Sequence, residues 1–147
     1  MKALIVYDSL TGQTEKIAQA ISSGMMEVGF VDHVVKKVSN TTTDDFKQAD
    51  VWVVGSPTHL STATRHIRNA LRDATKAGAQ GKKAVVFDTR IGGVEKGSND
   101  KVVPILTEAG VQVLFVESFL IVSNHLDAGE EMKAVTLGRK IAGALRP

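Results

Sequence analysis

Short apolar runs alternate with amphipathic segments along the whole chain. The apolar runs are typical of buried strands, with one partly alternating run that suits an edge strand: residues 2–7, 31–38 (the edge candidate), 50–55, 83–88 and 111–123. Apolar residues at helical spacing predict helices at residues 14–28, 43–48, 62–77, 98–109 and 127–145. Strands that alternate with helices predict an α/β protein, a doubly wound three-layer sandwich that forms a single domain over residues 1–147.

Two positions affect the predicted boundaries of these elements. Pro104 belongs in the first turn of a helix, so we expect the helix at 98–109 to start later than its capping candidates at 98–100 indicate. We also expect the last strand to break at Glu117 and Ser118, two polar residues within its apolar run.

The segments after Tyr7, Gly55 and Asp88 are candidate binding loops, because ligands of such a sheet bind beyond the carboxyl ends of its strands. The first segment places three hydroxyl side chains and a glycine before a predicted helix, whose N-terminus offers unpaired N–H groups and partial positive charge. This combination suits a phosphate group. The candidate ligands are Ser9, Leu10, Thr11, Gly12, Gln13 and Thr14. A hydroxyl-rich helix cap without a ligand is the alternative interpretation.

Residues 5–21 resemble the signature of the flavodoxin family. They contain an apolar strand, an aromatic residue, the pattern Ser/Thr-x-Thr-Gly-x-Thr from Ser9 to Thr14, and a helix with alanines. The resemblance implies that this loop holds the 5′-phosphate of FMN. It also implies the flavodoxin-like arrangement, a five-stranded parallel sheet in the order 2-1-3-4-5. The last strand carries no long insertion, so the chain resembles the short-chain type.

Residues 55–61 are similar to the second cofactor loop of that family, which commonly reads Gly-Ser-Pro-Thr-aromatic and runs beside the flavin ring. Here His59 replaces the aromatic residue. The resemblance makes five residues candidate FMN contacts: Ser56, Pro57, Thr58, His59 and Leu60. We expect His59 to cover the flavin edge or to form a hydrogen bond with it, and the alternative is a histidine exposed on a loop.

Residues 88–98 follow the fourth strand, where the family has its third cofactor loop. Their glycines suit close approach to a planar ligand, and the candidate contacts are Asp88, Thr89, Arg90, Gly92 and Gly93. We expect Arg90 to lie near the electron-rich edge of the flavin, where a cation stabilises the reduced, anionic ring. The alternative is an ordinary glycine-rich turn with a solvated arginine.

The composition narrows the classes of function. Hydrophobic residues make up 43% of the chain and charged residues 23%, as in folded proteins, and the net charge of +2 gives no whole-chain signal for nucleic-acid binding. The absence of cysteine excludes disulfides, thiolate nucleophiles and cysteine-ligated metals, which fits a reducing compartment. No apolar run approaches the roughly 20 residues of a membrane span. We therefore expect a cytoplasmic protein with neither a membrane nor a nucleic-acid partner.

A stripe of basic residues follows the second loop, on the helix predicted at 62–77. It consists of Arg65, Arg68 and Arg72, with Lys76 one turn further on. Flavodoxins are usually acidic around the cofactor, so this stripe departs from the family. It suits the docking of an acidic redox partner or an anionic substrate, and a solvated helix face is the alternative.

Three functions remain open at this point. The first is an FMN-binding electron carrier between redox partners, in which the flavin does the chemistry and no side chain is catalytic. The second is an FMN-dependent NAD(P)H:quinone-type reductase. The basic stripe favours it, and so does the lack of glycine between Ser56 and Ala77, where the family often flips a peptide on flavin reduction. The third is a fold that has lost flavin binding, because aromatic residues make up only 5% of the chain and none lies in the three loops.

Overall fold

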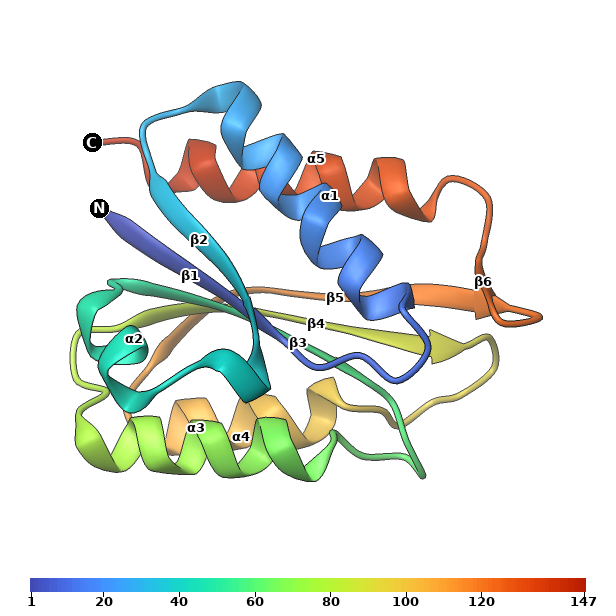
Figure 1. Ribbon diagram of the computed structural model, residues 1–147, viewed down its shortest axis with the longest axis horizontal. Coiled ribbons are helices and arrows are strands. Elements are labelled where there is room, and N and C mark those ends of the chain that lie inside the picture. The colour runs from blue at the N-terminus through green and yellow to red at the C-terminus, as the bar shows by residue number, and fades with distance from the viewer.

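A six-stranded sheet lies between two layers of helices in the computed structural model, which describes residues 1–147 (Figure 1). The strands are β1 (Lys2–Tyr7), β2 (Asp32–Lys37), β3 (Val51–Pro57), β4 (Lys83–Ile91), β5 (Gln112–Val122) and β6 (His125–Leu126). Their order is β2-β1-β3-β4-β5-β6, and every pair is parallel except the antiparallel pair β5–β6. The predicted order 2-1-3-4-5 and the edge position of β2 are confirmed. The short strand β6 was not predicted.

The helices cover both faces of the sheet (Figure 1). One face carries α1 (Gln13–Val28) and α5 (Glu130–Ala144), and the other carries α2 (Thr43–Gln48), α3 (Arg65–Ala77) and α4 (Asn99–Glu108). A short 3-10 helix, η1 (Val38–Asn40), links β2 to the segment before α2. All five predicted helices are present. None of them is both long and apolar enough to cross a membrane.

Alternate residues of the central strands point into two separate hydrophobic cores. On β1, Ile5 and Tyr7 pack beneath α1 and α5, whereas Leu4 and Val6 pack against the helices of the opposite layer. The same alternation continues on β3 and β4, so these strands are buried on both faces. Trp52 of β3 is fully buried, and its ring N–H donates to the carbonyl of Phe46 at 2.9 Å.

Two expectations about element boundaries were wrong. Helix α4 begins at Asn99, and Pro104 lies inside it rather than in its first turn. The first turn is held from outside the helix, because the N–H of Asn99 donates to the Asp88 carboxylate at 3.0 Å. Strand β5 runs without a break through Glu117 and Ser118. The irregularity in its pairing lies nearer the start of the strand, opposite the Ala84–Val85 step of β4.

Helices α1 and α5 approach each other closely at two glycines. A Cβ at Gly138 would lie 2.0 Å from the carbonyl oxygen of Ile21, and a Cβ at Gly24 would lie 2.0 Å from the carbonyl oxygen of Val135. Both neighbours are backbone atoms, which cannot rotate away as a side chain can. Glycine at these two positions therefore sets how tightly the upper helical layer packs.

We expect Gly138→Ala to lower the free energy of unfolding by about 1–3 kcal/mol, because the two helix backbones must separate to admit the methyl group. Gly143→Ala on the same helix is the matched control. Gly143 is exposed and no atom lies within 4 Å of its ideal Cβ position, so alanine there should stabilise the helix by about 0.5–1 kcal/mol. Chemical denaturation of both variants measures the difference, and equal stabilities would contradict the prediction.

Candidate functional site

Three loops leave the same edge of the sheet, because β1, β3 and β4 are adjacent and parallel. We call them loop 1 (residues 8–12, between β1 and α1), loop 2 (residues 58–64, between β3 and α3) and loop 3 (residues 92–98, between β4 and α4). The remaining candidate residues lie at the ends of β3 and β4 or at the start of α1. The structure thus brings the three predicted segments together.

Loop 1 leads into α1, and the first backbone N–H groups of this helix are free to donate hydrogen bonds. No side chain caps α1, and the N–H groups of residues 13–15 have no hydrogen-bond partner. By contrast, Thr42 and Thr64 cap α2 and α3 with their side chains. Gly12 adopts φ 96°, a conformation that favours glycine, and its N–H donates to the Ser9 hydroxyl at 3.0 Å. Uncapped donors and hydroxyl groups without a lysine or arginine in the loop fit a phosphate held by neutral groups.

The side chains of the first turn of α1 tie loop 1 to distant strands. Buried Thr14 places its hydroxyl 2.9 Å from the hydroxyl of Thr89 on β4. The hydroxyl of Thr11 donates to the side-chain oxygen of Gln13, whose amide group donates to the carbonyl of Asn124. The turn between β5 and β6 is therefore part of the site, although the sequence analysis did not include it. Polar turn residues between apolar ones at positions 121–126 were the available signal.

The end of β3, which leads into loop 2, lies in the protein interior. The Ser56 hydroxyl accepts the N–H of Thr64 at 3.1 Å, and Pro57 is buried beside it. The hydroxyl of Thr58 accepts the N–H of Ser98 at 3.0 Å, which joins loop 2 to loop 3. These contacts hold the two loops at a fixed separation.

The tip of loop 2 is a tight turn at His59–Thr62. His59 and Thr62 exchange backbone hydrogen bonds of 2.8 and 3.0 Å, and the two residues between them have positive φ, 51° for Leu60 and 63° for Ser61. This is the backbone pattern of a type I′ turn, which usually contains asparagine or glycine. The loop thus adopts left-handed conformations without glycine, and it leaves His59 and Leu60 exposed.

Loop 3 is held by one buried ion pair. Asp88 is fully buried and binds Arg90 through two contacts, 3.1 Å to Nε and 2.5 Å to Nη2. The hydrogen bond to Asp88 raises the pKa of Arg90 above its ordinary value. Arg90 also donates from Nη1 to the carbonyls of Val94 and Glu95, at 3.3 and 3.0 Å. These bonds anchor the loop, so the guanidinium is not the solvated side chain of the alternative interpretation.

Thr89, Gly92 and Gly93 complete the third set of candidates. Thr89 is buried, and its carbonyl accepts the N–H of Thr58 at 2.8 Å. Gly92 and Gly93 form an exposed turn, with φ 87° at Gly93. The side chain of Leu10 on loop 1 is also largely exposed, at 58%.

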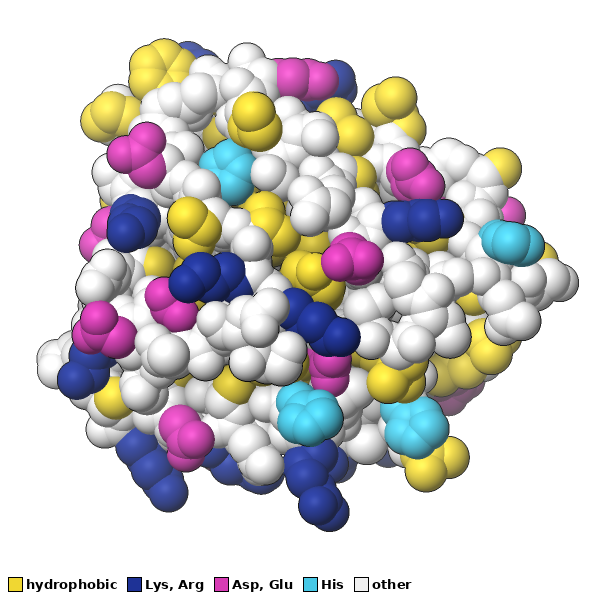
Figure 2. Space-filling view, viewed as in Figure 1, with side chains coloured by type: hydrophobic (Ala, Val, Ile, Leu, Met, Phe, Trp, Pro, Cys, Tyr) yellow, Lys and Arg dark blue, Asp and Glu magenta, His cyan; other side chains and the backbone are white.

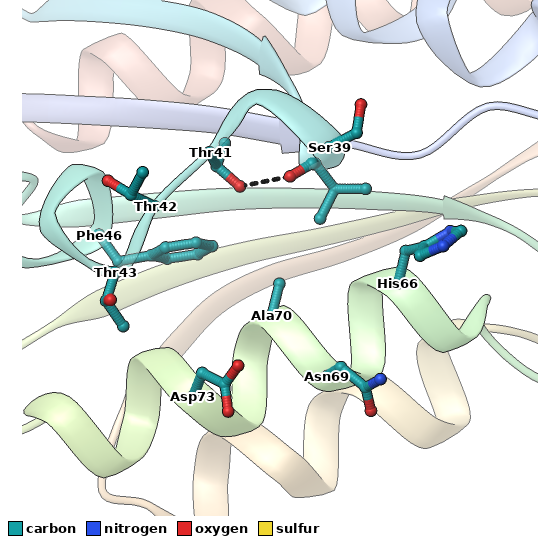
Figure 3. Close-up of a pocket in the computed structure, with 10 residues that line it drawn as sticks. Ser39, Thr41, Thr42, Thr43, Phe46, His66, Asn69, Ala70 and Asp73 are labelled. Carbon is teal, nitrogen blue, oxygen red and sulfur yellow. Dashed lines mark hydrogen bonds between the residues drawn. The ribbon is translucent and has the colours of Figure 1, made fainter.

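Two hollows flank the N-terminal half of α3. One, of about 380 Å³, lies between loop 1, loop 2 and the first turn of the helix. The other, of about 250 Å³, lies between α3 and the segment of η1 and α2 (Figure 3). In Figure 3 the hydroxyl residues lie on that segment, and Asn69, Ala70 and Asp73 lie across the hollow on α3. His66 lines both hollows, and only the first contains arginine.

Tyr7, at the end of β1, has a strongly perturbed hydroxyl group. Burial, followed by a 2.6 Å hydrogen bond to Glu15, raises the pKa of Tyr7 to about 12. In the unfolded chain the pKa is about 10. The folded state therefore binds this proton more tightly than the unfolded state does.

The stability that this proton contributes is fully present below about pH 10 and is lost as the pH rises through about 12. Tyr7→Phe should remove this alkaline component of the stability curve. Because the chain has one tyrosine, phenolate absorbance during a pH titration reports on Tyr7 alone. A phenol that titrates near pH 10 in the folded protein would contradict the prediction.

Residues 5–135 match the family model described as flavodoxin. The chain belongs to the flavodoxin family. Flavodoxins bind FMN and transfer electrons to redox partners.

Two curated flavodoxins are similar in sequence. That of Aquifex aeolicus is 36% identical over 59 residues, and the aligned stretch covers 40% of this chain and about a third (32%) of that protein. That of Clostridium saccharobutylicum is 23% identical over 118 residues, which cover 80% of this chain and 73% of that protein.

Solved flavodoxin structures share the fold. A flavodoxin from the domain Archaea superimposes with a TM-score of 0.82 at 23% identity, and 98% of each chain is covered. Flavodoxin 1 from Bacillus cereus gives 0.80 at 19% identity, with 99% of each chain covered. These neighbours confirm the flavodoxin-like fold predicted from the sequence.

Proposed function

We propose that this flavodoxin carries electrons between redox proteins with FMN bound across loops 1, 2 and 3. The observation that carries the proposal is the uncapped start of α1. Three free N–H groups at residues 13–15 lie beside the hydroxyls of Ser9 and Thr11, at the edge of the sheet where ligands of such folds bind. The phosphate of FMN would accept hydrogen bonds from these donors.

In this proposal the flavin ring contacts loops 2 and 3. Leu60 of loop 2 and Ile91 at the end of β4 are 86% and 66% exposed, and a bound ring would bury part of both side chains. Thr58, Gly92 and Gly93 supply backbone close to the ring, and His59 at the loop tip covers or binds its edge. Contact with aliphatic rather than aromatic side chains distinguishes this site from the usual flavodoxin pattern.

Titration of cofactor-free protein with FMN, followed by visible absorbance, tests the binding step. We expect saturable binding of one FMN per chain and no reduction of the bound flavin by NAD(P)H alone, since a carrier needs a separate reductase. Consumption of NAD(P)H by the purified protein would favour the quinone-type reductase instead. A failure to bind FMN would overturn the proposal.

The docking face for the partner is the basic stripe of α3, formed by Arg65, Arg68 and Arg72. None of these arginines has a carboxylate within 4.0 Å. Figure 2 shows Lys and Arg side chains projecting along the lower edge of the molecule, where α3 lies in Figure 1. Unpaired cations of this kind suit an acidic redox partner, whose association should slow as the salt concentration rises.

A further inference from the structure

Strand β5 leaves one edge of the sheet open along most of its length. It pairs with β4 on one side, whereas on the other side only its last two residues, Ile121 and Val122, pair with β6. No strand adjoins residues 112–120 on that side. The open edge of a strand presents unpaired N–H and C=O groups, which can hydrogen-bond to a further strand supplied by another chain.

Helix α5 and the residues before it cover the C-terminal part of this edge. The N–H of Leu120 donates to the Glu130 carboxylate, and its carbonyl accepts the N–H of Asp127, both at 2.9 Å. The carbonyl of Ser118 accepts from Nζ of Lys133, also at 2.9 Å. The backbone groups of these even-numbered residues of β5 therefore point away from β4.

Val116 lies at the uncovered part of the edge. It is two positions before Ser118, and because the backbone of a strand alternates with a period of two, its N–H and C=O also point away from β4. No strand lies opposite them on that side. The side chain of Val116 is 51% exposed. Many proteins place a charged residue or a proline at such a position to block pairing, and here the position holds a valine, which favours strands.

A second copy of the chain can pair with this edge about a twofold axis through Val116. Two antiparallel β5 strands in this register would exchange two backbone hydrogen bonds between the two copies of Val116. Phe115 of each copy would lie opposite Glu117 of the other, in the pair type whose Cα atoms are only about 4.5 Å apart. Both side chains lie on the face of the sheet that α5 covers.

Charge complementarity favours this register. Nζ of Lys140 on α5 lies 4.2 Å from the ring centroid of Phe115, and no carboxylate lies within 4.0 Å of it. In the pair of strands this cation would lie beside Glu117 of the second copy, and the symmetry would repeat the contact. Within its own chain Glu117 has only a 3.8 Å contact with Lys133. An axis through Glu117 would instead bring two carboxylates together, and an axis through Phe115 would bring the two Lys140 side chains together.

We propose that two copies of this protein associate through β5, so that their sheets join into one. The carboxyl ends of the parallel strands would then point in opposite directions in the two copies, which leaves the three loops of each copy open. None of the residues that form the contact belongs to those loops or to the basic stripe of α3. A contact made mainly by one strand is small, so the association should be weak and should depend on concentration.

Sedimentation equilibrium of the FMN-saturated protein over a range of concentrations tests the proposal. The cofactor-free protein is measured beside it, so that the result does not depend on FMN binding. We expect a monomer–dimer equilibrium that Val116→Lys weakens by about tenfold or more, because two lysines would lie directly opposite each other at the axis. Val122→Lys is the matched control: Val122 lies on the same strand and is 52% exposed, but its edge is already paired with β6, so the equilibrium should not change.

Single cysteines test the position of the axis. The chain has no cysteine of its own, so each variant carries one thiol. In Val116→Cys the two Cα atoms would be about 5.5 Å apart across the axis, a distance that a disulfide spans. Mild oxidation should therefore cross-link this variant into a dimer, and should cross-link Val122→Cys far more slowly.

A charge exchange tests the register. Lys140→Glu should weaken association by about fivefold to thirtyfold, since two attractive contacts become repulsive, and adding Glu117→Lys should recover most of the loss. Circular dichroism of each variant shows whether it is folded. A protein that stays monomeric up to about 1 mM would overturn the proposal. Equal dimerisation of Val116→Lys and Val122→Lys would place the contact on another face, and a Lys140→Glu defect that Glu117→Lys does not repair would contradict the register.

Discussion

The variant in which Thr11 and Thr14 are both alanine is expected to bind FMN about two to four orders of magnitude more weakly than the parent. Each hydroxyl would donate to a charged phosphate, and a hydrogen bond to a charged group contributes about 1.5–3 kcal/mol. The phosphate has no lysine or arginine in loop 1 to replace these donors. Riboflavin, which lacks the phosphate, should bind the variant and the parent with similar affinity.

Two controls separate binding from folding in this experiment. Thr14→Ala also breaks the 2.9 Å contact with Thr89, so thermal unfolding of the cofactor-free variant must be measured beside its affinity. Ser23→Ala removes an exposed hydroxyl on the same helix, one that donates only to the carbonyl of Gln19, and should leave FMN affinity unchanged. An unchanged FMN affinity in the double variant would overturn the assignment of the phosphate to loop 1.

Arg90→Ala is expected to lower the free energy of unfolding by about 3–5 kcal/mol, the usual cost of breaking a buried ion pair from one side. Asp88 has no exposed surface, and without Arg90 its carboxylate would keep only the N–H of Asn99, at 3.0 Å. The carbonyls of Val94 and Glu95 would also lose their donor, so loop 3 should become mobile. Chemical denaturation measures the first effect, and amide hydrogen exchange in loop 3 measures the second.

Arg139→Ala provides the comparison for this prediction. Arg139 of α5 pairs with Glu27 of α1 at 2.5 Å, but both side chains are about half exposed and solvent screens the pair, so its loss should change stability little. Adding Asp88→Asn to Arg90→Ala replaces the unpaired charge with a neutral amide and should recover part of the lost stability. If Arg90→Ala proves no less stable than Arg139→Ala, the ion pair does not anchor the loop.

The sequence predicted the sheet well because the residues of each central strand are enough to show that the strand is buried on both faces. In β1 and β3 nearly every residue is apolar. Such a short apolar run is typical of a strand buried on both faces of a parallel sheet, and it can be recognised without knowing which strands lie beside it. The boundaries were less accurate. Pro104 was expected in a first turn, but the contact of Asn99 with Asp88, a residue outside the helix, decided where α4 begins.

In the candidate site, too, some features could be predicted from the sequence and others depended on contacts between distant residues. The hydroxyl pattern of loop 1 and the order of the loops were visible in the sequence, because a helix start and its preceding residues are neighbours along the chain. The roles of Arg90 and Ser56 were not visible, since both depend on what their side chains contact. The turn at Leu60 and Ser61 was also missed, because neither residue type favours positive φ.

By itself, the amino-acid sequence determined the α/β class, the strand order through its family signature, and the segments that form the site. Only the tertiary structure decided which side chains meet there. The contact of Thr14 with Thr89 joins residues 75 positions apart, and that of Gln13 with Asn124 joins residues 111 positions apart. Periodicity along a chain reports which face of an element is buried, but it carries no information on which distant residue lies opposite, and that pairing is set when the strands assemble.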